Sequence, residues 1–156
     1  MANDVTKVRP ATNADAVHIS ALCDQLGYPA SSKQVAQRIK VIQRQDDHTL
    51  LVAQGSDSSL LGWVHIYLCP LVVSELEAEI GGLVVDERYR GQGIGQLLMR
   101  HAEVWSSERG CQAFRLRSNI IRKNAHDFYE RIGYGKIKTS CVFRKELVSP
   151  KASNMP

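Results

Sequence analysis

The stretch that decides the fold is Arg90-Gly91-Gln92-Gly93-Ile94-Gly95, where an arginine and three glycines interrupt an apolar sequence. The run before it, Leu83-Val84-Val85, is typical of a buried strand end. After it, apolar side chains recur at helical spacing as far as Trp105. The pattern therefore predicts a strand, a glycine loop and a helix in succession.

A helix that opens on glycines is suited to hold a phosphate group. Its first N–H groups have no partners within the helix, and the helix dipole places partial positive charge at the same end. Glycines let an anion approach these donors, and the guanidinium of Arg90 can bind a further phosphate oxygen. The alternative is a tight turn that needs glycines only for its geometry.

The spacing of the glycines separates this loop from two common nucleotide loops. Gly91, Gly93 and Gly95 follow G-x-G-x-G, whereas the dinucleotide fingerprint requires G-x-G-x-x-G. The Gly-Lys-Ser/Thr of a Walker loop does not occur. What remains, R-x-x-G-x-G, resembles the acetyl-CoA pyrophosphate loop of the GNAT superfamily of N-acetyltransferases. The later segment Phe128-Tyr129-Glu130-Arg131-Ile132-Gly133-Tyr134 resembles that family's late helix and turn.

Periodicity and turn residues predict the order of the elements. We expect strands at 5–9, 49–53, 60–68, 75–85, 113–118 and 136–145, and helices that end at Gly27, begin at a Ser32 cap, follow the glycine loop and span 123–132. This is the order of the GNAT fold. The resemblance implies a single α/β (α+β) domain over residues 1–148, with a mixed, mostly antiparallel sheet splayed between strands 4 and 5 and about four flanking helices. Residues 149–156 are expected to be a disordered polar tail.

Composition narrows the class of protein. The chain has 156 residues, enough for one domain, and its 20 Lys and Arg residues are scattered among 16 Asp and Glu, which argues against a nucleic-acid surface. Four separated cysteines and five histidines form no metal-binding motif. The first residues show no leader and no apolar run has membrane-spanning length, so we expect a cytoplasmic protein that binds no membrane and can form a homodimer.

Acetyl transfer to an amine requires a base, a donor for the oxyanion and a proton for the leaving thiolate. Glu75, Glu77 and Glu79 alternate along one predicted strand and so share a face, where they predict an acidic patch that attracts a small cationic amine and raises the pKa of one carboxylate. The resemblance implies that Glu79 is the catalytic base, directly or through water. A solvated edge strand is the alternative for the other two carboxylates.

The strand before the loop has features that suit a thioester cofactor. Gly81-Gly82 predicts a β-bulge or a close backbone approach, with relief of crowding by a helix as the alternative. The Leu83 N–H can then polarise the thioester carbonyl, while Val85 pairs with the pantetheine arm. The predicted acetyl-CoA contacts are Leu83, Val84, Val85, Arg90, Gly91, Gln92, Gly93, Ile94, Gly95, Asn119, Arg122 and Asn124.

The resemblance also implies that Tyr129 is the general acid, although a tyrosine packed in the core is the alternative. Many relatives carry an asparagine seven residues before this tyrosine. Here that position is Arg122, so Asn119, Arg122 and Asn124 are alternative cofactor contacts. The resemblance further implies that the loop around Tyr28 shapes the acceptor site.

The sequence thus predicts an acetyl-CoA-dependent N-acetyltransferase that needs no metal and transfers the acetyl group directly to a primary amine, because no cysteine has a nucleophile setting. Three alternatives stay open. They are a non-catalytic acyl-CoA-binding sensor or interaction module, a protein lysine or N-terminal acetyltransferase, and a protein that binds another phosphate ligand such as a nucleotide.

Overall fold

The structure, a computed structural model, describes residues 5–149. The chain divides into two compact parts, residues 1–117 and 118–156. In the first part the elements are β1 (Val5–Pro10), η1 (Asn13–Asp15), α1 (Ala16–Leu26), α2 (Ser32–Gln43), β2 (His48–Gly55), β3 (Leu60–Cys69), β4 (Glu77–Val85), η2 (Glu87–Tyr89), α3 (Ile94–Glu108) and β5 (Ala113–Arg115). The second part holds α4 (Lys123–Arg131).

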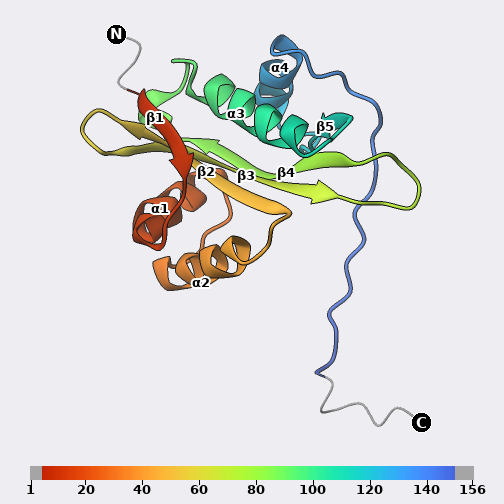
Figure 1. Ribbon diagram of the computed structural model, residues 1–156, viewed down its shortest axis with the longest axis horizontal. Coiled ribbons are helices and arrows are strands. Elements are labelled where there is room, and N and C mark those ends of the chain that lie inside the picture. Colours follow the sequence, from red (N-terminus) through yellow and green to blue (C-terminus); the bar gives the residue numbers. More distant parts are fainter. Residues whose placement is uncertain (1–4, 150–156) are drawn as a thin grey trace. The chain divides into compact units, whose positions relative to one another are not determined.

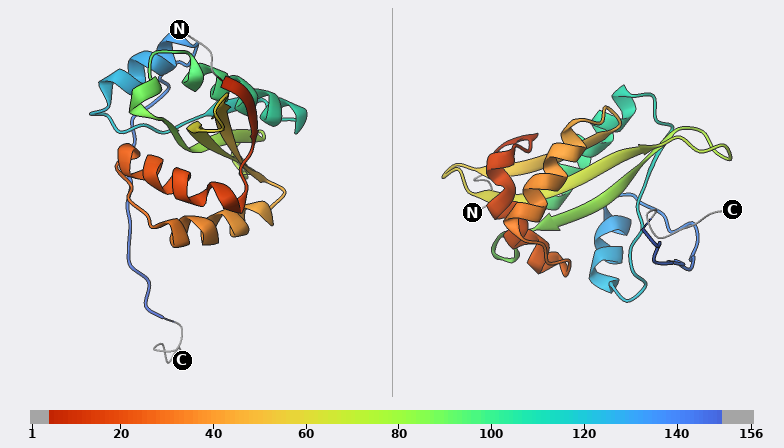
Figure 2. Two further views of the ribbon diagram at one scale, coloured as in Figure 1. Left: turned by 90° about the vertical axis from the view of Figure 1, so that its left-hand side faces the viewer. Right: turned by 90° about the horizontal axis from the view of Figure 1, so that it is seen from below.

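The first part is built on a mixed sheet with the strand order β1-β2-β3-β4-β5. Strands β1 to β4 are antiparallel, and β5 runs parallel to β4. Helices α1 and α2 cover one face of this sheet and α3 covers the other (Figures 1 and 2). The predicted class, a mostly antiparallel mixed sheet with four helices along the chain, is confirmed.

Successive strand residues point to opposite faces, so each face has its own apolar core. On one face Ile19 of α1 and Ile39 of α2 pack with Val52 and Trp63 of the sheet. On the other face, Leu98 of α3 belongs to a cluster with buried side chains of β2, β3 and β4. The two cores hold the sheet between helices. This packing positions the end of β4, from which the glycine loop continues.

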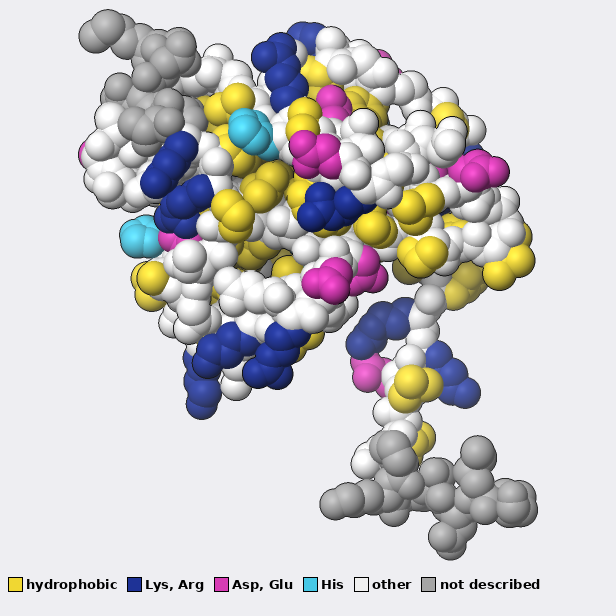
Figure 3. All heavy atoms as spheres, viewed as in Figure 1, with side chains coloured by type: hydrophobic (Ala, Val, Ile, Leu, Met, Phe, Trp, Pro, Cys, Tyr) yellow, Lys and Arg dark blue, Asp and Glu magenta, His cyan; other side chains and the backbone are white. Residues whose placement is uncertain are grey.

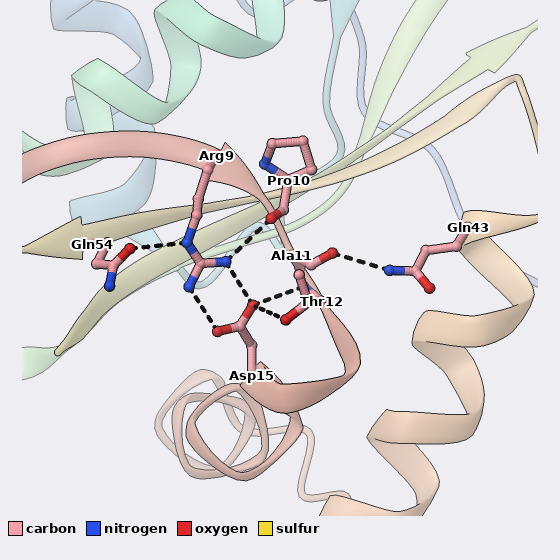
Figure 4. A network of polar contacts seen from close by, with 7 residues as sticks. All are labelled: Arg9, Pro10, Ala11, Thr12, Asp15, Gln43 and Gln54. Atoms are coloured by element: carbon pink, nitrogen blue, oxygen red, sulfur yellow. Dashed lines mark hydrogen bonds and ion pairs between the residues drawn. The ribbon is translucent and has the colours of Figure 1, made fainter. Parts of the chain in front are cut away.

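An ion-pair network fixes the connection from β1 to α1 (Figure 4). The guanidinium of Arg9 contacts both carboxylate oxygens of Asp15, at 2.8 and 2.9 Å, and the Thr12 N–H donates to the same carboxylate at 2.7 Å. Arg9 also donates to Gln54 of β2 at 2.9 Å. The ion pair with Arg9 lowers the pKa of Asp15, so this buried carboxylate stays charged. Thr12 and Asp15 thus form a capping box at the start of η1.

The C-terminal end of α1 and the N-terminal cap of α2 are formed by specific residues. Helix α1 ends at Gly27 in the left-handed conformation (φ 91°), as predicted. The prediction that Ser32 caps the second helix is wrong, because Ser31 is the cap: its Oγ accepts from the Gln34 N–H at 3.2 Å. The Ser31 N–H in turn donates to the side-chain oxygen of Gln34 at 2.9 Å. This reciprocal pairing requires a cap three residues before Gln34, which is the position of Ser31.

The strands differ from prediction mainly at the end of the chain. Strand β4 begins at Glu77 rather than Glu75, and β5 ends at Arg115 rather than Ser118. The strand predicted at 136–145 is wrong for the described residues, because this segment makes no ladder with another strand. Its apolar side chains, such as Ile137 and Phe143, are instead 84% and 93% exposed. Residues 150–156 of the predicted tail lie outside the described residues.

Candidate active site

The glycine loop connects the end of β4 to the start of α3 in the first part of the chain. Arg90 donates from Nε to the carbonyl oxygen of Val85 at 3.0 Å, which folds the loop back against the strand end. Gly91 and Gly93 have φ values of 74° and 83°, which non-glycine residues adopt only with strain. The predicted strand, loop and helix are all present, with α3 beginning at Ile94.

The N-terminus of α3 offers donors to an anion. Its N-cap is Gly93, and no side chain within residues 5–149 caps it. A Cβ built on Gly91 or Gly93 would meet no atom within 4 Å, so the space over the loop is open. Conformation rather than crowding therefore requires the glycines, and the first-turn N–H groups remain available to a phosphate.

The pairing of β4 with β5 is confined to the first residues of β4. Their ladder covers only Glu77 to Glu79 on β4, although β4 continues to Val85. This end of pairing agrees with the splay predicted between strands 4 and 5, and the β4 edge from Ile80 to Val85 extends beyond the last pair with β5. An extended arm whose pyrophosphate sits at the α3 N-terminus would run back along this edge toward Glu79.

The predicted bulge at Gly81-Gly82 is confirmed. His65 of β3 pairs with Gly82 and the next residue, Ile66, pairs with Ile80, which leaves Gly81 as the extra residue. A Cβ on Gly81 would lie 2.6 Å from His65 Nδ1, and a Cβ on Gly82 would lie 2.8 Å from Trp63. Crowding thus also requires both glycines, and it comes from β3 side chains rather than from a helix.

A row of polar side chains crosses the sheet where the splay begins. His48 pairs with Tyr67, Tyr67 with Glu79, and Glu79 with Arg115, so one residue from each of β2, β3, β4 and β5 lies in register. We call these four residues the polar row. Because strand residues alternate between faces, the row shares the α1 and α2 side of the sheet with Trp63.

Two histidines and a tyrosine stack at one end of the polar row. His48 Nδ1 lies 2.9 Å from His65 Nε2, and the rings of His65 and Tyr67 lie 5.2 and 5.4 Å from that of His48. Burial, with a smaller contribution from His48, lowers the pKa of His65 to about 4. The sequence analysis missed His48, which the register of the β2–β3 hairpin could have placed opposite Tyr67.

Glu79 is buried and held by two arginines. It is 3% exposed, and its carboxylate accepts from Arg115 Nε at 3.1 Å and lies 2.9 Å from Arg117 Nε. Arg115 also lies 3.6 Å from Glu77. The predicted patch of three carboxylates is therefore wrong: Glu75 precedes β4, and the other two carboxylates are ion-paired. Sequence reasoning missed these arginines, although their i, i+2 spacing on the predicted strand after α3 placed them on one face.

Cys69 lies at the edge of this cluster. Its Sγ is 3.5 Å from the carboxylate of Glu79. Burial and the neighbouring carboxylate raise the pKa of the Cys69 thiol. A thiol held in its protonated form is a poor nucleophile.

The second part carries the remaining predicted residues around α4. The Tyr129 ring lies 5.2 Å from that of Phe128 and 6.1 Å from that of Tyr134, and burial raises the pKa of its phenol. Arg122 is the N-cap residue of α4, and a shallow hollow is lined by residues 121–125, which include Asn124. The side chain of Asn119 accepts from the Ile121 N–H at 3.1 Å and so supports the turn before the helix.

Residues 5–149 offer neither a metal-binding cluster nor a membrane-spanning helix. No group of three or more His, Cys, Asp or Glu side chains is arranged to hold a metal ion among them. None of their helices is both long and apolar enough to cross a membrane. Tyr28, in the loop expected to shape the acceptor site, follows the end of α1 and is mostly exposed.

The chain has sequence relatives among N-acetyltransferases. An aminoalkylphosphonate N-acetyltransferase of Salmonella typhimurium is 45% identical over 56 residues, which cover 36% of each chain. An aminoglycoside N(6')-acetyltransferase type 1 of Stenotrophomonas maltophilia is 22% identical over 144 residues, 90% of this chain and 93% of that protein. The chain thus spans about a third of the first relative and nearly all of the second.

Solved structures share the fold. The aminoglycoside antibiotic 6'-N-acetyltransferase AAC(6')-IG of Acinetobacter haemolyticus superimposes with a TM-score of 0.79 at 19% identity, covering 92% of this chain and all of that one (100%). AAC(6')-Iy in complex with a bisubstrate analogue of CoA also has a TM-score of 0.79, at 15% identity over 90% of this chain and 98% of that one.

The family profile described as "Acetyltransferase (GNAT) family" matches residues 15–134. This match spans the glycine loop, the polar row and the Tyr129 segment. It confirms the predicted family and, with it, the acyl donor expected for the loop. The chain therefore belongs to the GNAT family, as an N-acetyltransferase that takes its acetyl group from acetyl-CoA.

Proposed function

We propose that this chain transfers the acetyl group of acetyl-CoA directly to the primary amine of a small molecule. The observation that carries the proposal is the α3 N-terminus, uncapped by any described side chain, which follows a strand that continues past its last pair with β5. The helix end suits a pyrophosphate and the free strand edge suits the pantetheine arm. We expect Leu83, Val84, Val85 and the six loop residues from Arg90 to Gly95 to contact the cofactor.

Direct transfer requires a neutral amine and a protonated leaving group. In the proposed mechanism the ammonium proton passes to Glu79, directly or through an ordered water, and the amine nitrogen then attacks the thioester carbonyl carbon. The N–H of Leu83 donates to the oxyanion. As the C–S bond breaks, Tyr129 gives its proton to the CoA thiolate.

Several contacts support these roles. Ion pairs with Arg115 and Arg117 fix the orientation of the Glu79 carboxylate at the closed end of the splay. The raised pKa of Tyr129 keeps its phenol protonated at neutral pH, as a general acid requires. The raised pKa of Cys69 argues against an acyl-cysteine intermediate. Asn119, Arg122 and Asn124 stay candidates for further cofactor contacts.

A small acceptor is favoured by the names of the relatives, which describe acetyltransferases of an aminoalkylphosphonate and of aminoglycosides. We also propose that the protein works in the cytoplasm and binds neither nucleic acid nor membranes. On the face shown in Figure 3, Lys and Arg side chains form several separate groups among other surfaces rather than one basic track.

The chain is also proposed to form a homodimer. Apolar side chains between residues 137 and 148 are exposed in the single chain. Five of them, Ile137, Val142, Phe143, Leu147 and Val148, are at least 77% exposed. Burial of these side chains against a second copy would remove an apolar surface that is unusual in a monomer.

The test is a thiol-release assay with acetyl-CoA and a panel of amines, with products identified by mass spectrometry. We expect CoA release that depends on a small primary amine and yields its N-acetyl derivative. Acetyl-CoA binding without turnover of any amine would instead identify a sensor. Turnover of peptide lysines or N-termini alone would identify a protein acetyltransferase.

A further inference from the structure

We propose that the acceptor carries an acidic group, such as a carboxylate or phosphonate, beside its amine, and that Arg117 binds this group. The inference rests on the proposed function and narrows its substrate class. It begins from the place of the polar row. The row crosses β4 at Glu79, the last β4 residue paired with β5, where the thioester end of the cofactor is expected.

The charges at this place do not favour a polycation. Glu79 is paired with Arg115 and Arg117, and Glu77 lies 3.6 Å from Arg115, so each carboxylate of the cluster already faces a guanidinium. His65, stacked at the other end, is uncharged at neutral pH because burial lowers its pKa to about 4. An acceptor with several ammonium groups would meet no unpaired carboxylate in this cluster.

Arg117 is the exposed member of the cluster. Its side chain is 69% exposed, compared with 28% for Arg115 and 4% for Glu79. Among residues 5–149, Arg117 forms an ion pair with Glu79 through its Nε atom. The two terminal nitrogens of the guanidinium are left for a further partner. A guanidinium anchored through Nε presents two parallel N–H groups, the geometry that binds a carboxylate or phosphonate in bidentate fashion.

The stacked rings complete the site. His48, His65 and Tyr67 form a wall of rings on the same face as Glu79: the His48 ring stacks on the other two, and the His65 and Tyr67 rings, 6.0 Å apart, are tilted by 45° to each other. Such a wall suits a short aliphatic chain. An acceptor can therefore place its amine toward the thioester and its acid on Arg117, with Glu79 between the two functions.

The experiment compares acceptors of similar length: 2-aminoethylphosphonate, β-alanine, propylamine and 1,3-diaminopropane. We expect the wild type to show kcat/KM values at least about ten-fold higher for one or both acids than for the other two amines. Arg117→Gln should lower kcat/KM for the preferred acid at least about ten-fold more than for propylamine, and Arg117→Lys should restore part of this difference. Arg109→Gln, at an exposed arginine beyond α3, is the matched control and should change nothing.

Comparison of the two acids shows which acidic group Arg117 prefers. A preference for the phosphonate and a preference for the carboxylate would each support the proposal. A wild-type preference for 1,3-diaminopropane would overturn the inference and leave the proposed function standing. So would an equal loss for all four amines in Arg117→Gln, because Arg117 would then act only through Glu79. If none of the small amines supported CoA release, the proposed function itself would be overturned.

Discussion

Tyr67 and Glu79 lie directly opposite each other on β3 and β4, at the last β4 residue that pairs with β5. Before this pair β4 is paired with β5, and after it β4 continues to Val85 without pairing to β5. Glu79 therefore lies at the boundary between the expected cofactor cleft and the expected acceptor side.

Gly93→Ala should weaken acetyl-CoA binding. Its φ of 83° makes alanine unfavourable by about 1 kcal/mol, and relief of that strain would turn the first N–H groups of α3 away from the pyrophosphate. We expect the KM for acetyl-CoA to rise about ten-fold. Gly110→Ala is the matched control, because Gly110 has a φ of 81° just beyond the other end of α3. Equal KM changes in both variants would contradict the anion site.

Tyr129→Phe should lower kcat by about a hundred-fold with little change in either KM, because it removes the proton for the thiolate and keeps the ring packing. Tyr134→Phe changes a ring 6.1 Å away in the same cluster and should retain activity. Steady-state kinetics at several pH values would check this. A Tyr129→Phe enzyme as active as the wild type would remove Tyr129 from the mechanism.

Glu79→Gln should lower both activity and stability. It leaves Arg115 and Arg117 beside a neutral side chain that is 3% exposed, which we expect to lower the free energy of unfolding by about 3 kcal/mol. Glu77→Gln, at a partly exposed carboxylate 3.6 Å from Arg115, should cost less than about 1 kcal/mol. Urea titrations measure both values. Similar costs in the two variants would contradict the central position of Glu79 in the cluster.

Acidification should destabilise the protein through His65. The folded pKa of about 4 lies below the ordinary value of 6.5, so between these values the unfolded chain binds a proton that the folded chain does not. The neutral His65 ring makes its full contribution to the free energy of unfolding above pH 6.5. This free energy falls by up to about 3 kcal/mol as the pH drops to 4. His65→Gln should flatten this part of the curve relative to His101→Gln, an exposed histidine on α3. Parallel curves would show that His65 does not cause the dependence.

Phe143→Asp should convert a dimer into a monomer without loss of folding. The Phe143 side chain is 93% exposed in the single chain, so its replacement removes no buried contact within one copy of the protein. Val17→Asp, at an exposed apolar residue of α1, is the control and should remain dimeric. Light scattering coupled to gel filtration reports the mass. A monomeric wild type would dismiss the proposed homodimer.

Local patterns predicted much of the fold. The glycine loop, the helix after it and the bulge at Gly81 depend on neighbouring residues, so the sequence around each is sufficient to predict it. The final strand at 136–145 was wrong because a strand needs a partner, and alternation along one segment says nothing about whether a partner exists.

The candidate site was harder to predict for the same reason. Glu79 could be chosen from its place before the loop, but its ion pairs come from Arg115 and Arg117, more than thirty residues later. The contact of His48 with His65 likewise depends on the register of two strands. Charges that look like an acidic patch along one strand are neutralised by a strand that the sequence alone does not align with it.

The most direct test of the account is hydrogen exchange of the backbone amides, measured with and without acetyl-CoA. The account places the pyrophosphate on the N-terminus of α3 and the pantetheine arm on the free edge of β4. It therefore predicts slower exchange for peptides that cover residues 83–85 and 90–96, and no comparable change when ATP replaces acetyl-CoA. Unchanged exchange in both segments at saturating acetyl-CoA, or equal protection by ATP, would contradict it.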